Sequence, residues 1–343
     1  MKDYRKQQSV RKEITIGETD SNIQNTNYPK TSPGTQIRVG VIGLSVHSAA
    51  YTEIINSGSE STEFNGCKVV AIFHPKGNPD VEFSEAQLQN FTDTIKKQGV
   101  AFVGSIKELV KKVDAVMLLT NDGRPHLKEI MPVLRAGKAV YVDKPLAANL
   151  SDVLRIFKVS GKYKVPTFSC SPLRYVKEAQ DIRQGMVVGK VLGANTYGPA
   201  PIQKSHADLF WDGIHAVESL YTVMGGTGCQ TVSRTFTDDA DVVVGHWDGG
   251  RVGVFRGVRK GKSGFGGTAF GDGGIASIGV FSGYRPLVVA IVEFFRTRKS
   301  PVTDDETIEI YAFMEAADES KRQGGIPVKV SDVLLRAKRE IRS

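Results

Sequence analysis

Lys144 stands where a charged side chain could act on a ligand. It lies in the tripeptide Asp143-Lys144-Pro145, directly after a short apolar strand predicted at 139–142. In an open α/β sheet, ligands bind at the carboxyl ends of the strands. Proline fixes the backbone after the lysine and donates no hydrogen bond there. The pattern predicts a lysine held at the edge of a pocket, with a solvated turn as the alternative.

The segments around this lysine alternate between strand and helix patterns, which predicts a doubly wound parallel sheet. From 187 the pattern changes to consecutive strands, followed by a glycine-dense stretch at 245–283 with interleaved apolar residues, which predicts a large open, mostly antiparallel sheet. The predicted strands are 37–43, 67–73, 100–103, 113–119, 139–142, 166–170, 187–197, 231–236, 240–247 and 251–258. The predicted helices run through 54–55, over 84–97, from 105, from 126 to 136, and over 149–159, 286–295 and 308–322. The expected fold class is therefore α/β followed by α+β.

The first strand ends in a loop that resembles a dinucleotide-binding fingerprint. The segment Gly43-Leu44-Ser45-Val46-His47-Ser48 keeps the first glycine of Gly-x-Gly-x-x-Gly between a strand and a helix. Ser45 and Ser48 replace the other two glycines, so their hydroxyls could bond a phosphate or fill the space that a cofactor needs. The helix N-terminus stays an anion site in either case. We expect Gly43, Ser45, Val46 and His47 to contact the cofactor, with helix capping as the alternative for His47.

The second strand ends without the acidic residue that would bind the ribose hydroxyls of NAD. The chain has Phe73-His74-Pro75-Lys76 there instead. His74 or Lys76 could favour the 2′-phosphate of NADP, and an ordinary turn is the alternative.

The region around Lys144 is similar to the signature of the Gfo/Idh/MocA family, named after glucose–fructose oxidoreductase and inositol 2-dehydrogenase. Thr120-Asn121 is followed by His126, and the segment 134–147 contains the tripeptide near its end. The family's usual form is Glu-Lys-Pro, so Asp143 is a conservative departure. The resemblance spans roughly 36–330. It implies that Thr120, Asn121, His126, Asp143 and Lys144 contribute to a site for NAD or NADP.

A second cluster, Trp211-Asp212-Gly213-Ile214-His215, bears on catalysis through the same resemblance. The family places an aspartate and, four residues later, a histidine on a helix that faces the nicotinamide. His215 matches the histidine, Trp211 occupies the aspartate position, and Asp212 lies one residue later. The resemblance implies that His215 accepts the proton of a substrate alcohol while Lys144 stabilises its oxygen. A buried structural role is the alternative for such a histidine.

Other residues are substrate candidates on weaker grounds. Arg174 and Tyr175 are similar to a family segment near the substrate, and surface packing at a helix start is their alternative. Asp212 joins them as a substrate-binding candidate beside Lys144 and His215. His206 and Asp208 precede the second cluster and could line the same pocket. No histidine and carboxylate spacing typical of a metal site recurs, so no metal is expected.

We expect four segments in the chain: a mobile polar arm at 1–35, a Rossmann dinucleotide-binding domain at 36–147, a substrate and oligomerisation domain at 148–330 and a basic tail at 331–343. A C-terminal helix could pack back on the first domain. The resemblance implies pairing of the open sheet between subunits, so we expect a homo-oligomer, dimer or tetramer, through 231–283.

The expected function is an NAD(P)-dependent oxidoreductase that moves a hydride between the nicotinamide and a hydroxyl or carbonyl group of a sugar, polyol or derivative. The alternative is a binding or regulatory protein of the same family whose cofactor site is degenerate and whose dehydrogenase activity is weak or lost.

The composition excludes several other classes. The 343 residues are 40% apolar and 24% charged, which is typical of a globular protein. The formal net charge of +8 is partly concentrated at both ends without an aromatic-basic motif, so no nucleic-acid partner is expected. No stretch approaches the length of a membrane helix and the start lacks a secretory pattern, so we expect a cytoplasmic protein without a membrane partner. The cysteines Cys67, Cys170 and Cys229 predict neither a disulfide framework nor a zinc site.

Overall fold

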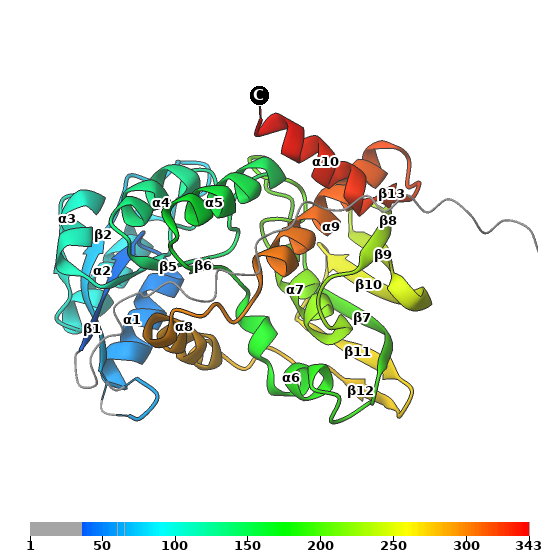
Figure 1. The fold of residues 1–343 in the computed structure, drawn as a ribbon, viewed down its shortest axis with the longest axis horizontal. Coiled ribbons are helices and arrows are strands. Elements are labelled where there is room, and N and C mark those ends of the chain that lie inside the picture. The colour runs from blue at the N-terminus through cyan, green and yellow to red at the C-terminus, as the bar shows by residue number, and fades with distance from the viewer. Residues whose placement is uncertain (1–35, 60, 65, 343) are drawn as a thin grey trace, which may run out of the picture.

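Two β-sheets organise the chain in a computed structural model that describes residues 36–59, 61–64 and 66–342 (Figure 1). The predicted mobile arm at 1–35 lies outside the described residues. The domain boundaries at 147/148 and 330/331 stay predictions. No helix within the described ranges is long and apolar enough to cross a bilayer.

The first sheet has the order β3-β2-β1-β4-β5-β6, and all its neighbouring strands are parallel. Its strands are β1 (Ile37–Ile42), β2 (Cys67–Phe73), β3 (Ala101–Phe102), β4 (Ala115–Leu118), β5 (Ala139–Val142) and β6 (Thr167–Phe168). The predicted doubly wound parallel sheet is confirmed. The strand order reverses between β1 and β4, so the carboxyl ends of these two strands form the switch point where such sheets bind ligands.

Helices cover both faces of this sheet. The helices are α1 (Val46–Ser57), α2 (Glu85–Lys97), α3 (Ile106–Lys112), α4 (His126–Arg135), α5 (Leu150–Tyr163) and α8 (Arg285–Thr297). Apolar side chains of α1, α2 and α8 share one buried cluster with β1, whereas those of α3, α4 and α5 belong to the cluster of the other face. The helix α8 therefore completes a layer of the first sheet although it comes from the second half of the chain.

The second sheet has seven strands in the order β12-β11-β7-β10-β9-β8-β13. Its strands are β7 (Val191–Pro199), β8 (Cys229–Phe236), β9 (Ala240–Trp247), β10 (Arg251–Val258), β11 (Gly266–Gly271), β12 (Ile275–Ser277) and β13 (Val328–Lys329). Only the pair β7 and β10 is parallel among these described strands, so the predicted mostly antiparallel sheet is confirmed.

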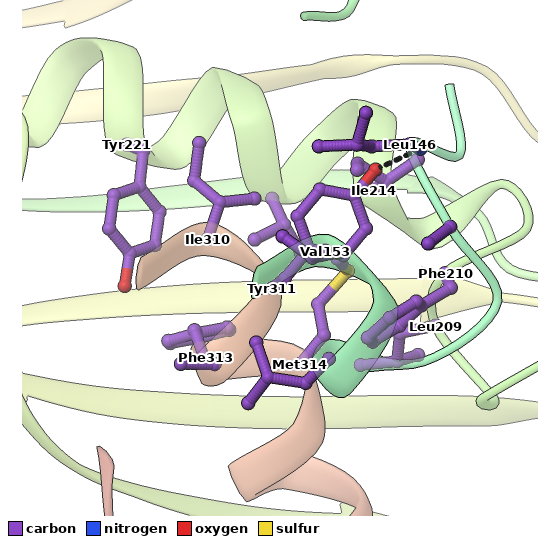
Figure 2. Close-up of a cluster of buried hydrophobic side chains, with 14 of the residues drawn as sticks. Leu146, Val153, Leu209, Phe210, Ile214, Tyr221, Ile310, Tyr311, Phe313 and Met314 are labelled. Carbon is purple, nitrogen blue, oxygen red and sulfur yellow. Dashed lines mark hydrogen bonds between the residues drawn. The ribbon is translucent and has the colours of Figure 1, made fainter. Parts of the chain in front are cut away.

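One face of the second sheet packs on helices, and the other carries exposed side chains. The remaining helices are α6 (Lys177–Arg183), α7 (Gly213–Met224), α9 (Asp304–Arg322) and α10 (Val330–Glu340), with short 3-10 turns η2 (Pro172–Tyr175) and η3 (Asp248–Gly250). On the open face, Tyr197 is 43% exposed and lies beside Arg256 of the parallel neighbour. The helices α7 and α9 meet α5 and the loop after β5 in an apolar core (Figure 2).

The segment 331–343, expected to be a basic tail, forms most of the helix α10 in its described residues. Val330, Val333 and Ala337 recur at helical spacing and are buried. Arg336 on the same helix pairs with Glu315 and Glu319 of α9. Part of the basic surplus therefore serves to dock this helix.

Candidate active site at the carboxyl edge of the parallel sheet

Gly43 lets the loop after β1 pass directly against the end of β4. Its φ of 98° lies in the region that side chains other than glycine rarely adopt. A Cβ at this position would lie 2.3 Å from the backbone nitrogen of Thr120. The first glycine of the fingerprint is therefore required by the fold itself.

Ser45 and Ser48 form a capping box at the start of α1. The Ser45 hydroxyl accepts a hydrogen bond from the Ser48 N–H at 3.2 Å and donates one to the carbonyl of Leu119 at 3.0 Å. The Ser48 hydroxyl in turn accepts from the Ser45 N–H at 2.5 Å. Both side chains are buried, so their hydroxyls close the contact between helix and strand. The two serines thus replace close glycine packing with hydrogen bonds.

The first turn of α1 still suits an anion. A capping box satisfies some N–H groups of the helix start, but those of Val46 and His47 have no acceptor within the helix. The Val46 side chain is 45% exposed at this point. Together with Gly43, these donors fit the pyrophosphate of a dinucleotide.

His47 turns away from the helix cap and binds Asp143. Its Nδ1 lies 2.5 Å from a carboxylate oxygen of Asp143, and Ser45 occupies the N-cap position. The Tyr141 hydroxyl donates to the other oxygen of Asp143 at 3.3 Å. Burial would raise the pKa of Asp143, but His47 and Lys144 outweigh it and hold that pKa below its usual range. Asp143 is therefore an anion that links the cofactor loop to the lysine tripeptide.

A pocket opens between the ends of β1, β2 and β4, beside the switch point. It is lined by Gly43, Leu44, His74, Pro75, Gly77, Asn78, Val81, Glu82, Thr120, Asn121 and Asp122. Gly43, His74, Thr120 and Asn121 were all expected at a cofactor site, and the structure brings them together here. Lys76 is exposed and is not part of the lining.

The side chain of His126 connects two loops. It is fully buried, and its ring nitrogens face two carbonyl oxygens, that of Leu146 at 3.1 Å and that of Thr120 at 2.9 Å. No part of the imidazole is accessible to a ligand. The expectation that His126 contacts a cofactor is therefore corrected: it ties the loop after β4 to the loop after β5.

Lys144 reaches from the end of β5 to the start of α7. Its ammonium donates to a carboxylate oxygen of Asp212 at 2.9 Å and to the carbonyl of Trp211 at 3.1 Å. Two residues later, the backbone N–H of Leu146 donates to the Tyr311 hydroxyl at 2.6 Å (Figure 2). The lysine is thereby held between the two sheets, with Asp212 as its counter-ion.

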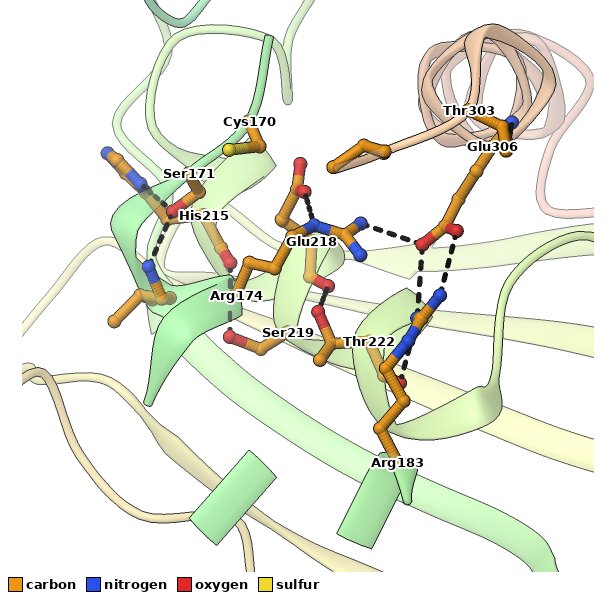
Figure 3. Close-up of polar contacts among 12 residues, drawn as sticks. Cys170, Ser171, Arg174, Arg183, His215, Glu218, Ser219, Thr222, Thr303 and Glu306 are labelled. Carbon is orange, nitrogen blue, oxygen red and sulfur yellow. Dashed lines mark hydrogen bonds and ion pairs between the residues drawn. The ribbon is translucent and has the colours of Figure 1, made fainter. Parts of the chain in front are cut away.

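His215 lies in the first turn of α7, close to this ion pair. Its Nδ1 lies 2.7 Å from the Ser171 hydroxyl (Figure 3). Desolvation, followed by the charges of Lys144 and His47, holds the pKa of His215 well below its usual range. The imidazole is therefore neutral at physiological pH, as a proton acceptor must be. Within the described part of the chain, no side chain bonds its Nε2, which leaves that nitrogen for a ligand.

Arg174 belongs to a buried ion network. Its guanidinium contacts Glu218 at 2.5 Å and Glu306 at 2.7 Å, and Arg183 binds Glu306 from the other side at 3.1 Å (Figure 3). Arg174 is 3% exposed, so its charge is directed at these carboxylates and not at a pocket. The Tyr175 hydroxyl is buried as well. The polar groups of both side chains are thus buried within the protein, contrary to the expectation that they contact substrate.

His206 and Asp208 also have structural partners. The His206 Nε2 accepts from the backbone N–H of Gly123 at 3.2 Å, and its side chain is buried. Asp208 pairs with Arg234 at 3.0 Å and with Lys321 at 2.7 Å. Neither residue lines the pocket beside Gly43.

Sequence reasoning overlooked two residues of this region. Ser171 follows β6 as Lys144 follows β5, so the rule of strand ends could have found it. Glu82 lines the pocket from a loop position that has no strand-end or motif signal.

Comparisons with known proteins agree with this arrangement. Residues 37–169 match an oxidoreductase family with an NAD-binding Rossmann fold, Gfo/Idh/MocA. A probable dehydrogenase from Thermotoga maritima has a similar structure, with a TM-score of 0.71 at 18% identity over 87% of this chain and 100% of the other. A scyllo-inositol dehydrogenase from Lactobacillus casei, solved with bound NAD(H) and scyllo-inositol, gives 0.70 at 14% identity over 87% and 100%. A putative myo-inositol dehydrogenase from Sinorhizobium meliloti 1021 gives 0.69 at 15% identity over 86% and 100%.

At these identities, the solved structures establish a shared fold, and the family match is confined to the parallel-sheet part of the chain. Residues 37–169 are similar to the Gfo/Idh/MocA oxidoreductase family with its NAD-binding Rossmann fold.

Proposed function

We propose that the chain is an NAD(P)-dependent oxidoreductase that transfers a hydride between the cofactor and a CH–OH or carbonyl group of a sugar, polyol or derivative. The main support for the proposal is a contact at the carboxyl edge of the parallel sheet. There, Lys144 binds Asp212 at the start of α7, the helix that carries the neutral His215. The inositol dehydrogenases of similar structure support a polyol as the substrate class.

The start of α1 supports a dinucleotide as the cofactor. Gly43 lets the backbone pass close to β4, and the N–H groups of Val46 and His47 at the helix start would bind the pyrophosphate. When bound, the nicotinamide would accept or supply the hydride, which no side chain can do.

The protein's own residues would handle the proton and the charge. In the oxidation direction, the hydroxyl proton passes to the free Nε2 of His215, while Ser171 at Nδ1 fixes the ring. The Lys144 ammonium stabilises the negative charge that develops on the oxygen. Asp212 holds Lys144 in place as its counter-ion. Both groups lie in a partly desolvated site, where such interactions are stronger than in water.

The test has two stages. Calorimetric titration with NAD⁺, NADH, NADP⁺ and NADPH comes first, followed by turnover of an inositol and sugar panel, monitored through reduction of the nicotinamide. Lys144→Met and His215→Asn should each lower kcat by about a hundredfold without changing the melting temperature much. Lys158→Met, an exposed lysine on α5, is the matched control and should keep full activity.

Two results would count against the proposal. Failure of all four nucleotides to bind at millimolar concentration would refute it and favour the alternative, a binding or regulatory protein of the family whose cofactor site is degenerate. Tight binding without turnover of any polyol, sugar or derivative would refute the proposed substrate class.

We also propose that the protein is a homo-oligomer, dimer or tetramer, in which the open face of the second sheet meets its counterpart. The support is the row of exposed side chains around Tyr197, which lie on a sheet face that no described element covers. A face of this kind favours association because burying its apolar atoms removes them from water.

A further inference from the structure

The cofactor pocket contains a carboxylate that the end of β2 lacks. Glu82 lines this pocket together with Gly43 and His74. It lies on the loop between β2 and α2, nine residues after the strand ends at Phe73. The fold thus brings an acid to the same edge of the sheet from farther along the chain.

The fold makes room for this carboxylate. One carboxylate oxygen of Glu82 accepts from the Phe83 N–H at 3.1 Å. The other lies 1.4 Å from where a Cβ of residue 77 would stand, so glycine at this position leaves the carboxylate its place. The loop is fixed as well, because Asn121 donates to the carbonyl of Val81 at 3.2 Å.

Of the two carboxylates that line the pocket, Glu82 is the one that remains available to a ligand. Asp122 lines the pocket too, but Arg124 at 2.9 Å and Asn78 at 2.5 Å already bind its oxygens. No lysine or arginine of the described chain forms an ion pair with Glu82. An unpaired carboxylate next to a nucleotide pocket accepts hydrogen bonds from a ribose diol and repels a phosphate.

The two residues expected to attract a 2′-phosphate, His74 and Lys76, do not neutralise the negative charge of Glu82. Lys76 is exposed outside the lining. His74 lines the pocket, but burial lowers its pKa despite the nearby charge of Glu82, so the ring is neutral at physiological pH. The local charge is therefore negative.

We infer that Glu82 binds the adenosine ribose hydroxyls and makes the protein selective for NAD(H) over NADP(H), an inference that rests on the proposed function. Glu82 takes the role of the acidic residue that usually follows the second strand. The sequence departure at His74-Pro75-Lys76 is then a displacement of this residue and not its loss.

The experiment is calorimetric titration of the full chain with NAD⁺ and NADP⁺, without any substrate. Wild-type protein should bind NAD⁺ at least tenfold more tightly. Glu82→Gln should weaken NAD⁺ binding by about ten- to a hundredfold, the range for a lost hydrogen bond to a charged group, and leave NADP⁺ binding equal or stronger. Glu85→Gln, an exposed glutamate three residues later, is the matched control and should change neither affinity.

A second variant tests the placement without removing the carboxylate. Gly77→Ala puts a methyl group where the Glu82 oxygen lies and should lower NAD⁺ affinity in the same direction. An unchanged ratio of the NAD⁺ and NADP⁺ affinities in Glu82→Gln overturns the inference and leaves the proposed function intact. Absence of binding by the wild-type protein would remove both.

Discussion

Replacing Arg174 with methionine should destabilise the protein because it leaves a carboxylate buried without its cation. Glu218 is 3% exposed, and within the described chain Arg174 is its ion-pair partner. Glu306 keeps its ion pair with Arg183 at 3.1 Å, so Glu218 is the carboxylate that loses its partner. Removing one partner of a buried pair costs ~3–5 kcal/mol. At roughly 2 °C per kcal/mol for a chain of this size, the melting temperature should fall by about 6–10 °C.

The pH dependence of this loss has a defined sign. Burial raises the pKa of Glu218 and the Arg174 charge opposes that rise. Without Arg174, the folded-state pKa climbs farther above the unfolded value of about 4.3. A group with a raised pKa binds more protons when folded, so stability is lost as pH rises through that window. The melting deficit of Arg174→Met should therefore be larger at pH 8 than at pH 5.

Thermal melts followed by fluorescence or calorimetry provide the measurement. The double variant Arg174→Met/Glu218→Gln should recover much of the loss because it removes the stranded charge. Arg174→Lys keeps a cation and should lose less than the methionine variant. A melting temperature within about 1 °C of wild type at both pH values, combined with a raised KM, would refute the structural role and restore Arg174 as a substrate residue.

Three other outcomes are expected. The acidic limb of the kcat/KM profile should lie below pH 6.5, and Ser171→Ala should shift that limb, because Ser171 contacts the His215 imidazole whose pKa is lowered; a limb above pH 7 would contradict this. Gly43→Ala should abolish nucleotide binding measured by calorimetry, since its methyl group meets the Thr120 backbone, and unchanged affinity would show that the loop can move away. Tyr197→Lys should reduce the mass measured by light scattering to that of a monomer by placing like charge beside Arg256, and an unchanged assembly would move the interface elsewhere.

The parallel half of the fold could be predicted well because its local signals agree with one another. Ser84 caps α2 and Asn149 caps α5, and apolar runs precede each turn. The helix α10 escaped prediction because its lysines and arginines conceal the spacing of Val330, Val333 and Ala337. A charge-based interpretation cannot tell a solvated tail from a helix docked by ion pairs.

The candidate site was predictable where a residue follows a strand directly. Lys144 belongs to this class, because the carboxyl end of a parallel strand fixes its location. The buried ion pairs of Arg174 could not be predicted, because its partners Glu218 and Glu306 are distant in sequence. Glu82 reaches its pocket through a loop path that depends on Gly77, a contact that no local pattern contains.

The position of α8 has a consequence for synthesis of the chain. All six strands of the parallel sheet have been made once Phe168 emerges from the ribosome, yet α8 spans Arg285–Thr297. Until then, the face that receives Leu287, Ile291 and Phe294 remains uncovered. Domains usually fold in order from the N-terminus during translation, but this one has to wait for a helix encoded much later. Its nascent chain therefore exposes an apolar face throughout the synthesis of most of the second sheet, and exposed apolar surface of this kind favours aggregation until α8 covers it.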